Sequence, residues 1–514
     1  SLRRAFGTEV LPADMTALAQ AKTILVVADD LESSHNVACL RVKDAVVRNG
    51  ARLMVVTPRW GELCDFAQVW LRPRPGEEAG ALAALAPAGG GSASGGGALD
   101  EPGQAPAPGP DQEVADSVQR AARILADAAR EPAEEKRIAV VYAVPHLGAE
   151  AAGAVAAAVA NLAIVCCGPE EAARCLFVLP AEANVWGLRD MGVASDLLPG
   201  HRPADDDRAR QEVGNAWGLG PSTLLRAGLG FREMLAAAQQ GRLKALVVLG
   251  DNPLFAAPDK AWVMNCLSSL DFLLVIDSLP SDTARLAQVV LPDVGVLGKD
   301  GTYTSADRRI VRLRAAVAPV GEARPAWQIL TDLGAVLAQR LGLDASRWNY
   351  SGPAQIMEEI AALVPLYRNG LRLWRMESGA QQAFEGLAAQ AGSLQPVAAE
   401  PAAAREGLVV STGRTLYTSW EGATLHSPEA DKLHREESAE INPGDAASLG
   451  VEDGQEVVLV NDHGQLTIRA RVSESVQPGS LFVPLYYDGG AVTALFGRED
   501  GGLPGVRIAV RATA

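Results

Sequence analysis

Hydrophobic residues near the start of the chain fall into short runs separated by a stretch of helical spacing. Residues 23–30, TILVVADD, form an apolar run that ends in two acids. Residues 36–50, NVACLRVKDAVVRNG, place apolar side chains at helical intervals and end in glycine, and residues 52–58, RLMVVTP, form a second apolar run. This order predicts a strand, a helix and a second strand.

The same plan returns later in the chain. Residues 245–253, ALVVLGDNP, and residues 272–278, FLLVIDS, are apolar runs on either side of a helical stretch, PDKAWVMNCLSSL. Residues 137–144 and 174–180 predict further strands. Because continuous apolar strands that alternate with helices favour parallel sheets covered on both faces, we expect two related, Rossmann-like α/β domains and an internal duplication.

The pattern changes after Gly407. Residues 457–474, VVLVNDHGQLTIRARVSE, contain two β-rich runs around Asn461–Gly464, a hairpin signature. Residues 441–460, INPGDAASLGVEDGQEVVLV, predict a short helix that ends at Gly450 and a strand after it. We therefore expect a C-terminal domain that is mostly β and forms a small barrel.

Two low-complexity segments divide the chain, and we interpret both as linkers or surface excursions because they hold too few large apolar side chains to fold. The expected organisation is a first α/β segment, a Gly/Pro/Ala-rich linker, a second α/β region, a second linker and the barrel. Their bounds are 1–86, 87–112, 113–390, 391–406 and 407–514.

Composition narrows the classes of function. The formal net charge of -16 and the pI near 5.0 argue against nucleic-acid binding, which needs a basic surface. The longest apolar stretch, residues 148–167, is alanine-rich and interrupted by Glu150 and Asn161, so it fails as a membrane span. Any attachment to a membrane would have to come through partners.

Ordinary catalytic motifs are missing from the sequence. The six cysteines form no CxxC pair, and the six histidines are scattered without an HExxH motif, so we assign no catalytic residue and no metal ligand. His426 and His434 are interpreted as surface or partly buried residues.

Polar residues at predicted strand ends are the remaining candidates. Asp251, Asn252 and Pro253 could meet a nucleobase edge, and Asp277 could accept hydrogen bonds from a guanine or ribose. The same residues are also common turn formers, and both interpretations stay open.

The segment GKDGTYTSADRR, residues 298–309, follows an apolar run, VVLPDVGVL, that predicts a buried strand. Its hydroxyl groups on Thr302, Thr304 and Ser305 could donate to phosphate. In the next segment, IVRLRAAV, Val311 and Leu313 should share one face and Arg312 and Arg314 the other, either solvated or facing an anion.

The order of these motifs resembles the molybdopterin oxidoreductase superfamily. The likeness rests on residues 25–82, on VVLGDNPL and the other internal motifs, and on residues 441–490, which are similar to that family's double-psi β-barrel. The internal motifs are ANVWGLRDMGVASDLLPG, VVLGDNPL, DSLPSDTARLAQVVLP, GKDGTYTSADRR and PVGEARPAWQIL.

The resemblance implies that strand-end loops and the barrel descend from a site for the guanosine and phosphate groups of two pterin dinucleotides. Carried over by motif, the implied cofactor-facing positions are Asn36, Thr57, Arg59, Asp251, Asn252, Pro253, Asp277, Gly301 and Thr302.

Several positions depart from the family pattern. Gly298 stands where a glutamate is common, Ser305 replaces an asparagine, Gln288 replaces an acid, and Asp307-Arg308-Arg309 replaces an EGR-like end; the barrel loop GGAVTALFG also lacks an asparagine. Each lost partner would cost on the order of 1–3 kcal/mol in a buried polar site. We therefore expect an eroded pocket, with molybdopterin guanine dinucleotide not assigned.

Within the superfamily, HNVACLRVKDAVV and PRWGELCDF are most similar to the large G subunit of NADH-quinone oxidoreductase, respiratory complex I. That resemblance implies a non-catalytic portion that supports electron transfer from NADH to quinone, with iron–sulfur clusters upstream. It also implies the other subunits of the peripheral arm as partners, and a cytoplasmic position on the inner face of the plasma membrane.

Two alternatives belong to other classes. One is a molybdopterin-dependent oxidoreductase such as a formate dehydrogenase alpha chain, which would bind a bis-pterin dinucleotide cofactor. The other is a free-standing binding module.

Overall fold

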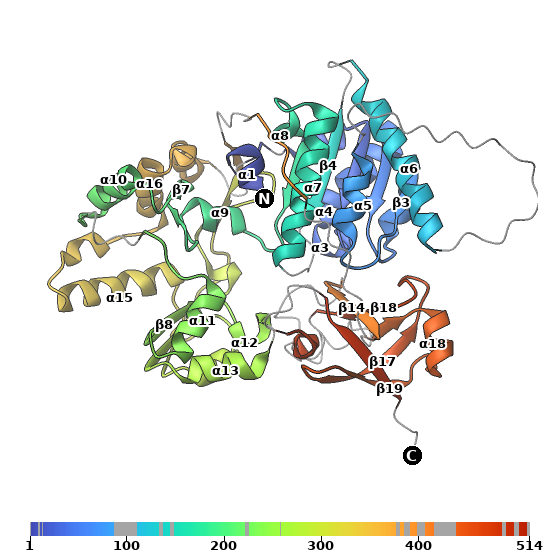
Figure 1. The fold of residues 1–514 in the computed structure, drawn as a ribbon. Coiled ribbons are helices and arrows are strands. Elements are labelled where there is room, and N and C mark those ends of the chain that lie inside the picture. The colour runs from blue at the N-terminus through green and yellow to red at the C-terminus, as the bar shows by residue number, and fades with distance from the viewer. Residues whose placement is uncertain are drawn as a thin grey trace, which may run out of the picture. The chain divides into compact units, whose positions relative to one another are not determined.

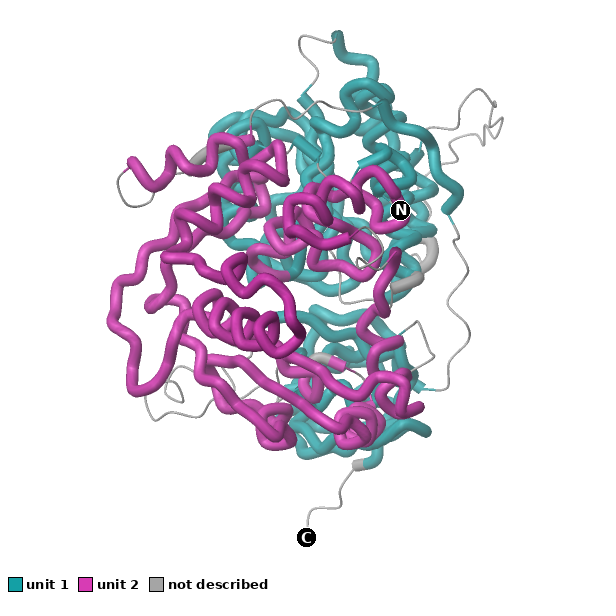
Figure 2. The backbone as a smooth tube through the Cα atoms, turned by 90° about the vertical axis from the view of Figure 1, so that its left-hand side faces the viewer, with its two compact units in different colours: residues 1–181, 388–514 teal, residues 182–387 magenta. Residues whose placement is uncertain are grey.

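The chain folds into two compact units in the computed structural model (Figure 2). Unit 1 comprises residues 1–181 and 388–514, and unit 2 comprises residues 182–387. Residues 87–109 and 398–406, which make up most of the two predicted linkers, lie outside the described residues, as do His426 and His434. The structure describes residues 2–8, 11–12, 14–86, 110–132, 137–143, 149–220, 226–257, 259–376, 381–384, 391–397, 407–415, 438–485, 490–497 and 503–510.

Unit 1 contains a parallel sheet with the strand order β3-β2-β1-β4-β5. Every residue of β1 and of β4 is buried, because helices cover both faces of the sheet (Figure 1). The sheet draws strands from both the 1–86 segment and the region after the first linker. Its strands are β1 Thr23–Val27, β2 Arg52–Val56, β3 Val69–Leu71, β4 Ile138–Ala143 and β5 Leu176–Leu179.

Helix signals in unit 1 behave as the sequence predicts. The helix α4, Asn36–Asn49, ends at Gly50, whose φ of 68° is the left-handed conformation that glycine adopts readily. Residues 391–397 are fixed to this unit rather than free, since Asn161 and Gln395 exchange two hydrogen bonds of 2.7 and 2.8 Å. The other helices beside the sheet are α1 Leu2–Phe6, α2 Met15–Ala19, α3 Leu31–Ser34, η1 Glu62–Phe66, α5 Glu78–Leu85, α6 Pro110–Ala129, α7 Ala149–Cys167 and α8 Ala172–Cys175.

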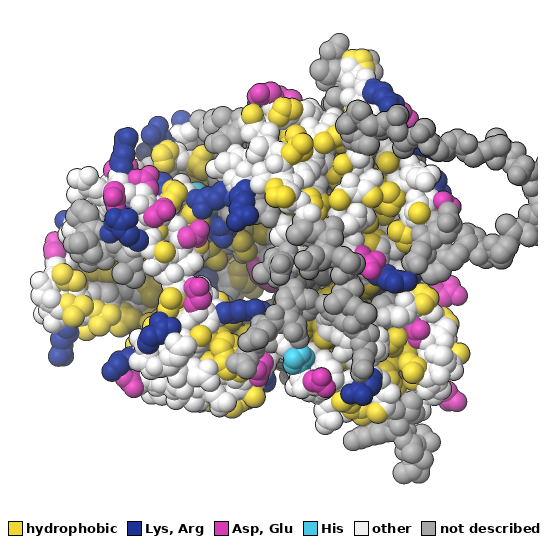
Figure 3. Space-filling model, in the orientation of Figure 1, with side chains coloured by type: hydrophobic (Ala, Val, Ile, Leu, Met, Phe, Trp, Pro, Cys, Tyr) yellow, Lys and Arg dark blue, Asp and Glu magenta, His cyan; other side chains and the backbone are white. Residues whose placement is uncertain are grey.

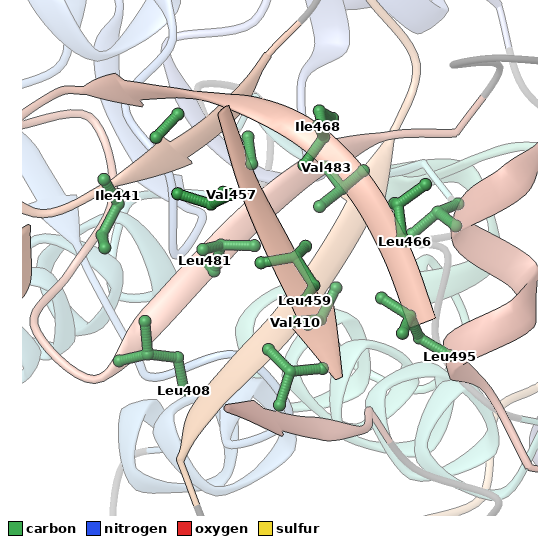
Figure 4. Close-up of a cluster of buried hydrophobic side chains, with 14 of the residues drawn as sticks. Leu408, Val410, Ile441, Val457, Leu459, Leu466, Ile468, Leu481, Val483 and Leu495 are labelled. Atoms are coloured by element: carbon green, nitrogen blue, oxygen red, sulfur yellow. The ribbon is translucent and has the colours of Figure 1, made fainter. Parts of the chain in front are cut away.

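The C-terminal part of unit 1 is a closed six-stranded barrel, as expected. Parallel pairs, β14 with β18 and β15 with β17, alternate with antiparallel ones, and β16 and β17 form the hairpin around Asn461–Gly464. Aliphatic side chains from all around the barrel fill its interior (Figure 4). Its elements are β14 Leu408–Gly413, β15 Ala439–Ile441, α18 Pro443–Leu449, β16 Glu456–Val460, β17 Gln465–Val472, β18 Ser480–Pro484, η8 Ala491–Leu495 and β19 Gly505–Val510.

Unit 2 holds a smaller parallel sheet with the order β10-β9-β8. The helices α11, Phe231–Gln239, and α13, Lys260–Ser268, supply apolar side chains to the core on one face. The helix α15, Ala326–Arg340, packs on the other. The strands are β8 Ala245–Leu249, β9 Phe272–Asp277 and β10 Val289–Pro292. The prediction that the run containing β10 is buried is wrong, because three of the four β10 residues are exposed.

A second, antiparallel sheet in unit 2 corrects another prediction. Residues Gly301–Thr304, expected as part of a loop, form the strand β11, which pairs with β12, Arg309–Leu313, and through it with β13, Gln381–Ala383. On β12 the buried side chains are Ile310 and Arg312, so the predicted apolar face of Val311 and Leu313 is also wrong. Arg312 pairs with Asp300 and lies 4.4 Å from the ring of Trp374.

Shorter elements complete unit 2. No helix among the described residues is both long and apolar enough to cross a membrane. The remaining elements are α9 Val185–Asp190, β6 Leu197–Leu198, β7 Arg202–Pro203, α10 Asp207–Trp217, α12 Pro253–Ala256, α14 Asp282–Leu286, η2 Val296–Gly298, η3 Ala345–Trp348, α16 Pro353–Leu363, η4 Pro365–Tyr367 and η5 Gly370–Arg375.

Candidate functional site

The carboxyl ends of β8 and β9 bring four predicted residues of unit 2 to one edge. Asp251, Asn252 and Pro253 follow β8, and Asp277 ends β9, the strand beside it. Although Asp251 keeps part of its surface exposed, surrounding protein desolvates its carboxyl group and raises its pKa, and the charge of Asp277 adds to the effect. Two neighbouring carboxylates at a sheet edge can accept hydrogen bonds from the N–H groups of a base.

The amide of Asn252 has a structural role at this edge. Its side chain is 6% exposed, and its Oδ1 accepts a 2.6 Å hydrogen bond from the hydroxyl of Thr283. The carboxylate of Asp277 accepts from the backbone N–H groups of Ser278 and Leu279 and so holds its own turn. Pro253 begins the short helix α12. The turn-former interpretation of these residues is therefore partly correct.

Gly301 and Thr302 lie on β11 in the antiparallel sheet. Gly301 does not adopt a left-handed conformation, and an added Cβ would meet no atom within 4 Å. Neither backbone strain nor packing within the described protein therefore explains a glycine there. Glycine in a strand often marks a place where another group approaches the backbone closely.

Next to β11, unit 2 contains a buried ionic cluster that the sequence analysis did not predict. Asp190 is fully buried and accepts hydrogen bonds from Arg308 at 2.9 Å, His201 at 2.6 Å and Tyr367 at 2.7 Å. The hydroxyl of Tyr367 also bonds that of Thr304, the last residue of β11. Burial alone would raise the pKa of Asp190, but the bond from His201 and the charge of Arg308 hold it below its usual range.

Backbone strain gathers at this Asp190 cluster. Arg308, at the middle position of the family's EGR-like end, has a φ of 58°, and His201 has a φ of 56°. Asn184, whose Oδ1 accepts the backbone N–H of Thr304, has a φ of 63°. Residues other than glycine adopt this region at a cost, and surrounding structure must hold them there. The cluster therefore fixes the end of β11.

In unit 1, two predicted residues meet the barrel. Thr57 follows β2, and its hydroxyl donates to the carbonyl of Asp29, which follows β1. The guanidinium of Arg59 makes two 2.9 Å hydrogen bonds to the carboxylate of Glu440 on β15 and lies 4.1 Å from the ring of Phe482. Burial alone would raise the pKa of Glu440, but these bonds and the charge of Arg59 lower it.

Asn36 does not share these contacts. It is exposed at the first position of α4. The structure thus places Thr57 and Arg59 together at the sheet edge and leaves Asn36 at a helix N-terminus.

Sequence reasoning also missed three residues at the same edge of unit 1. Burial raises the pKa of Glu78 to about 7, although the N–H of Gly76 donates to its carboxylate. Thr412, near the end of β14, has a buried hydroxyl without a partner among the described residues, and Gly413 approaches Asp29. The sequence signals available were the strand ending in Thr-Gly-Arg and the acid after Pro75-Gly76.

A parallel α/β fold with polar strand ends beside a closed barrel defines a class, and two family models identify it. Residues 103–336 match Molybdopterin oxidoreductase, and residues 408–502 match the Molydopterin dinucleotide binding domain. The chain belongs to the molybdopterin oxidoreductase family and carries its dinucleotide-binding domain. This match argues against the expectation of an eroded dinucleotide pocket.

Similar proteins extend this result. The chain is 31% identical to the NADPH-Fe(3+) oxidoreductase subunit alpha of Geobacter sulfurreducens, across 98% of this chain and 58% of that protein. It is 32% identical to a putative formate dehydrogenase of Bacillus subtilis, across 64% and 34%, and 31% identical to the F420-dependent formate dehydrogenase subunit alpha of Methanocaldococcus jannaschii, across 60% and 47%. The chain thus spans less than two thirds of each relative.

A solved structure shows the same fold. Acetylene hydratase from Pelobacter acetylenicus superposes with a TM-score of 0.66 at 16% identity, over 99% of this chain and 79% of that one. Among the relatives, the formate dehydrogenase names fit the alternative from the sequence better than the complex I branch does.

Proposed function

We propose that this chain is the cofactor-binding part of a formate dehydrogenase-like molybdopterin oxidoreductase, and that it holds molybdopterin guanine dinucleotide. The observation that carries the proposal is Gly301, whose side-chain space is open although nothing in its conformation or packing requires glycine. A phosphate group that approaches the backbone of β11 would explain it.

The donors and acceptors at the edge of unit 2 fit such a dinucleotide. Asp251 and Asp277 would accept hydrogen bonds from the N–H groups of guanine, while the hydroxyl of Thr302 would donate to phosphate. The Asp190 cluster holds β11 in place, so the donors on this strand are positioned before a ligand arrives.

The edge of unit 1 offers a second group of contacts. The buried hydroxyl of Thr412 lacks a partner among the described residues, and leaving such a group unpaired costs about 1–3 kcal/mol. A second dinucleotide would satisfy it beside Gly413 and Glu78. When bound, the molybdenum of the cofactor supplies the redox chemistry, and the residues of this chain bind and orient the dinucleotide.

One observation favours a second candidate, the complex I G-subunit portion that supports electron transfer without binding a pterin. Arg59, a predicted cofactor contact, instead pairs with Glu440, and the hydroxyl of Thr57 is used by Asp29. These contacts join the sheet to the barrel without a ligand. On this proposal the partners would be the other subunits of a peripheral arm, at the inner face of the plasma membrane, with iron–sulfur clusters elsewhere in the polypeptide.

The experiment compares two glycine substitutions in the full-length protein, produced in a host that makes the cofactor. Gly301→Val would fill the space above β11, and Gly295→Val is the matched control because Gly295 is also open and not left-handed. Oxidised-pterin fluorescence and elemental mass spectrometry for molybdenum and tungsten measure occupancy.

The expected result is metal and pterin in the unsubstituted protein and in Gly295→Val, with at least a tenfold loss in Gly301→Val. Circular dichroism should be the same for all three. A protein that contains neither pterin nor molybdenum or tungsten, but does contain iron, would contradict the proposal and favour the second candidate.

A further inference from the structure

Exposed apolar side chains are concentrated on unit 2. Of the 26 large hydrophobic residues that are exposed among the described residues, 20 lie within residues 182–387, although unit 2 is the smaller unit. Single exposed hydrophobic residues are ordinary, but a contiguous group marks a surface that something covers.

The strand β8 carries part of this group. Val248 is its one buried residue, whereas Val247 is 50% and Leu249 45% exposed. By register, Val247 lies opposite Leu274 and Leu249 opposite Ile276 of β9, which are both buried. The apolar face that α15 covers over β9 therefore continues, uncovered, onto β8.

The helix α15 shows the same change from covered to bare. Ile329 is buried, Leu333 partly buried, Leu337 50% exposed, and Leu341, just past the helix end, 71% exposed. Side chains four residues apart share one side of a helix, so this is one apolar stripe. Figure 3 shows hydrophobic side chains gathered along α15. We name Val247, Leu249, Leu337 and Leu341 the open face.

The edge of β8 is also incomplete. Within the described residues β8 pairs with β9 alone, so the other side of its backbone presents unpaired N–H and C=O groups. Helix α11 packs beneath β8 as a crossover helix does, but residues 226–230 before it form no strand of this sheet. A parallel sheet is normally buried on both faces and continued at such a position.

We propose that a strand and a helix from a further segment of the same polypeptide complete this sheet. The strand would pair with β8, and the helix would lie beside α15 on the open face. The choice of occupant rests on length: nearly all of this chain aligns with the Geobacter protein, yet it covers 58% of that protein, and the rest belongs to the same polypeptide there. Both faces of the open sheet then gain the cover seen in unit 1.

The test places the same substitutions in two lengths of protein. Val247→Asp/Leu249→Asp is introduced into the 514-residue chain and into the complete gene product. Val37→Asp/Val47→Asp on α4 is the matched control, because these valines are 65% and 68% exposed. Thermal unfolding and hydrogen exchange of the β8 amides are measured for each protein.

In the 514-residue chain we expect neither double variant to lower the Tm by more than 2 °C. In the complete gene product the β8 variant should lower it by at least 5 °C, while the control remains unchanged. Exchange of the β8 amides should be at least tenfold slower in the unsubstituted complete product than in the 514-residue chain. Since both units are present in the shorter chain, a difference between the lengths excludes cover by unit 1.

Three results would overturn the proposal. The first is equal exchange of β8 in both proteins. The second is a dimer of the 514-residue chain, seen by light scattering, that Val247→Asp/Leu249→Asp dissociates, because the cover would then be a second copy. The third is protection of β8 in the complete product only after a partner subunit is added.

Discussion

The two parallel sheets differ in how they satisfy their strands. In unit 1 all five residues of β1 are buried, and its strand-end charges pair with the barrel through Arg59 and Glu440. In unit 2 one of the five residues of β8 is buried, and the charges lie in the Asp190 cluster instead. Similar apolar sequences thus reach different burial, because burial depends on what packs on the strand as well as on its composition.

The comparison assigns stability to different sources. Unit 1 is expected to depend on apolar burial on both faces of its sheet. Unit 2, whose sheet is partly bare, is expected to depend more on the correct pairing of buried charges, since one unpaired charge in a protein interior is costly. Each of the following experiments tests this difference.

The largest expected effect is at the buried acid of unit 2. Asp190→Asn removes the charge that compensates Arg308, so unit 2 should lose about 3–5 kcal/mol of unfolding free energy. Urea denaturation followed by hydrogen exchange in each unit measures the loss, which should be absent from unit 1.

A compensating variant provides the control. Asp190→Asn/Arg308→Gly removes both charges and also relieves the φ of 58° at position 308. We expect it to recover at least half of the lost stability. If the double variant is no more stable than the single one, the ion pair is not the cause.

The fold could be predicted from the sequence to the level of its classes. Runs such as residues 23–30 indicated parallel strands, Gly50 and Gly450 marked helix ends, and Asn461–Gly464 marked a hairpin, because these signals are local. The exposure of β10 and the strand nature of Gly301–Thr304 were not predicted, since both depend on neighbours distant in sequence.

A second experiment compares equivalent leucines in the two sheets. Leu53→Ala in β2, at 0% exposure, should cost about 2–5 kcal/mol, because it leaves a cavity. Leu249→Ala in β8 should cost less than about 0.5 kcal/mol in the 514-residue chain, because the side chain is already 45% exposed. Equal losses in denaturant unfolding would remove the contrast between the sheets.

The smallest and most specific effect concerns pH. Glu78 has a folded pKa raised to about 7 from an ordinary value of 4.5, so the folded state binds the proton more tightly than the unfolded state. Stability should therefore fall as pH rises from about 4.5 to 7 and then level off, by an amount on the order of 3 kcal/mol. Glu78→Gln should flatten this dependence and be more stable than the unsubstituted protein at pH 8.

The control for this experiment is Glu77→Gln at the neighbouring position, which should keep the original pH dependence. A Glu78→Gln protein whose unfolding free energy changes with pH as before would show that another group is responsible.

The candidate site could be predicted only in part. Asp251 and Asp277 were identified because polar residues after parallel strands lie at one edge. The pairing of Arg59 with Glu440 could not be, since no local pattern connects residues 381 positions apart. The orphaned hydroxyl of Thr412 is likewise defined by burial, which an isolated Ser-Thr-Gly-Arg motif does not reveal.

The Arg59–Glu440 pair also has a consequence in time. During synthesis the first part of unit 1 emerges long before the barrel, and the two residues are separated by 381 positions. At about 5–20 residues per second, Arg59 must wait roughly 20 to 75 s for its carboxylate. For that interval the end of the nascent sheet presents an unpaired cation and the surface meant for the barrel, so the ribosome-bound chain is the form of this protein most in need of a chaperone.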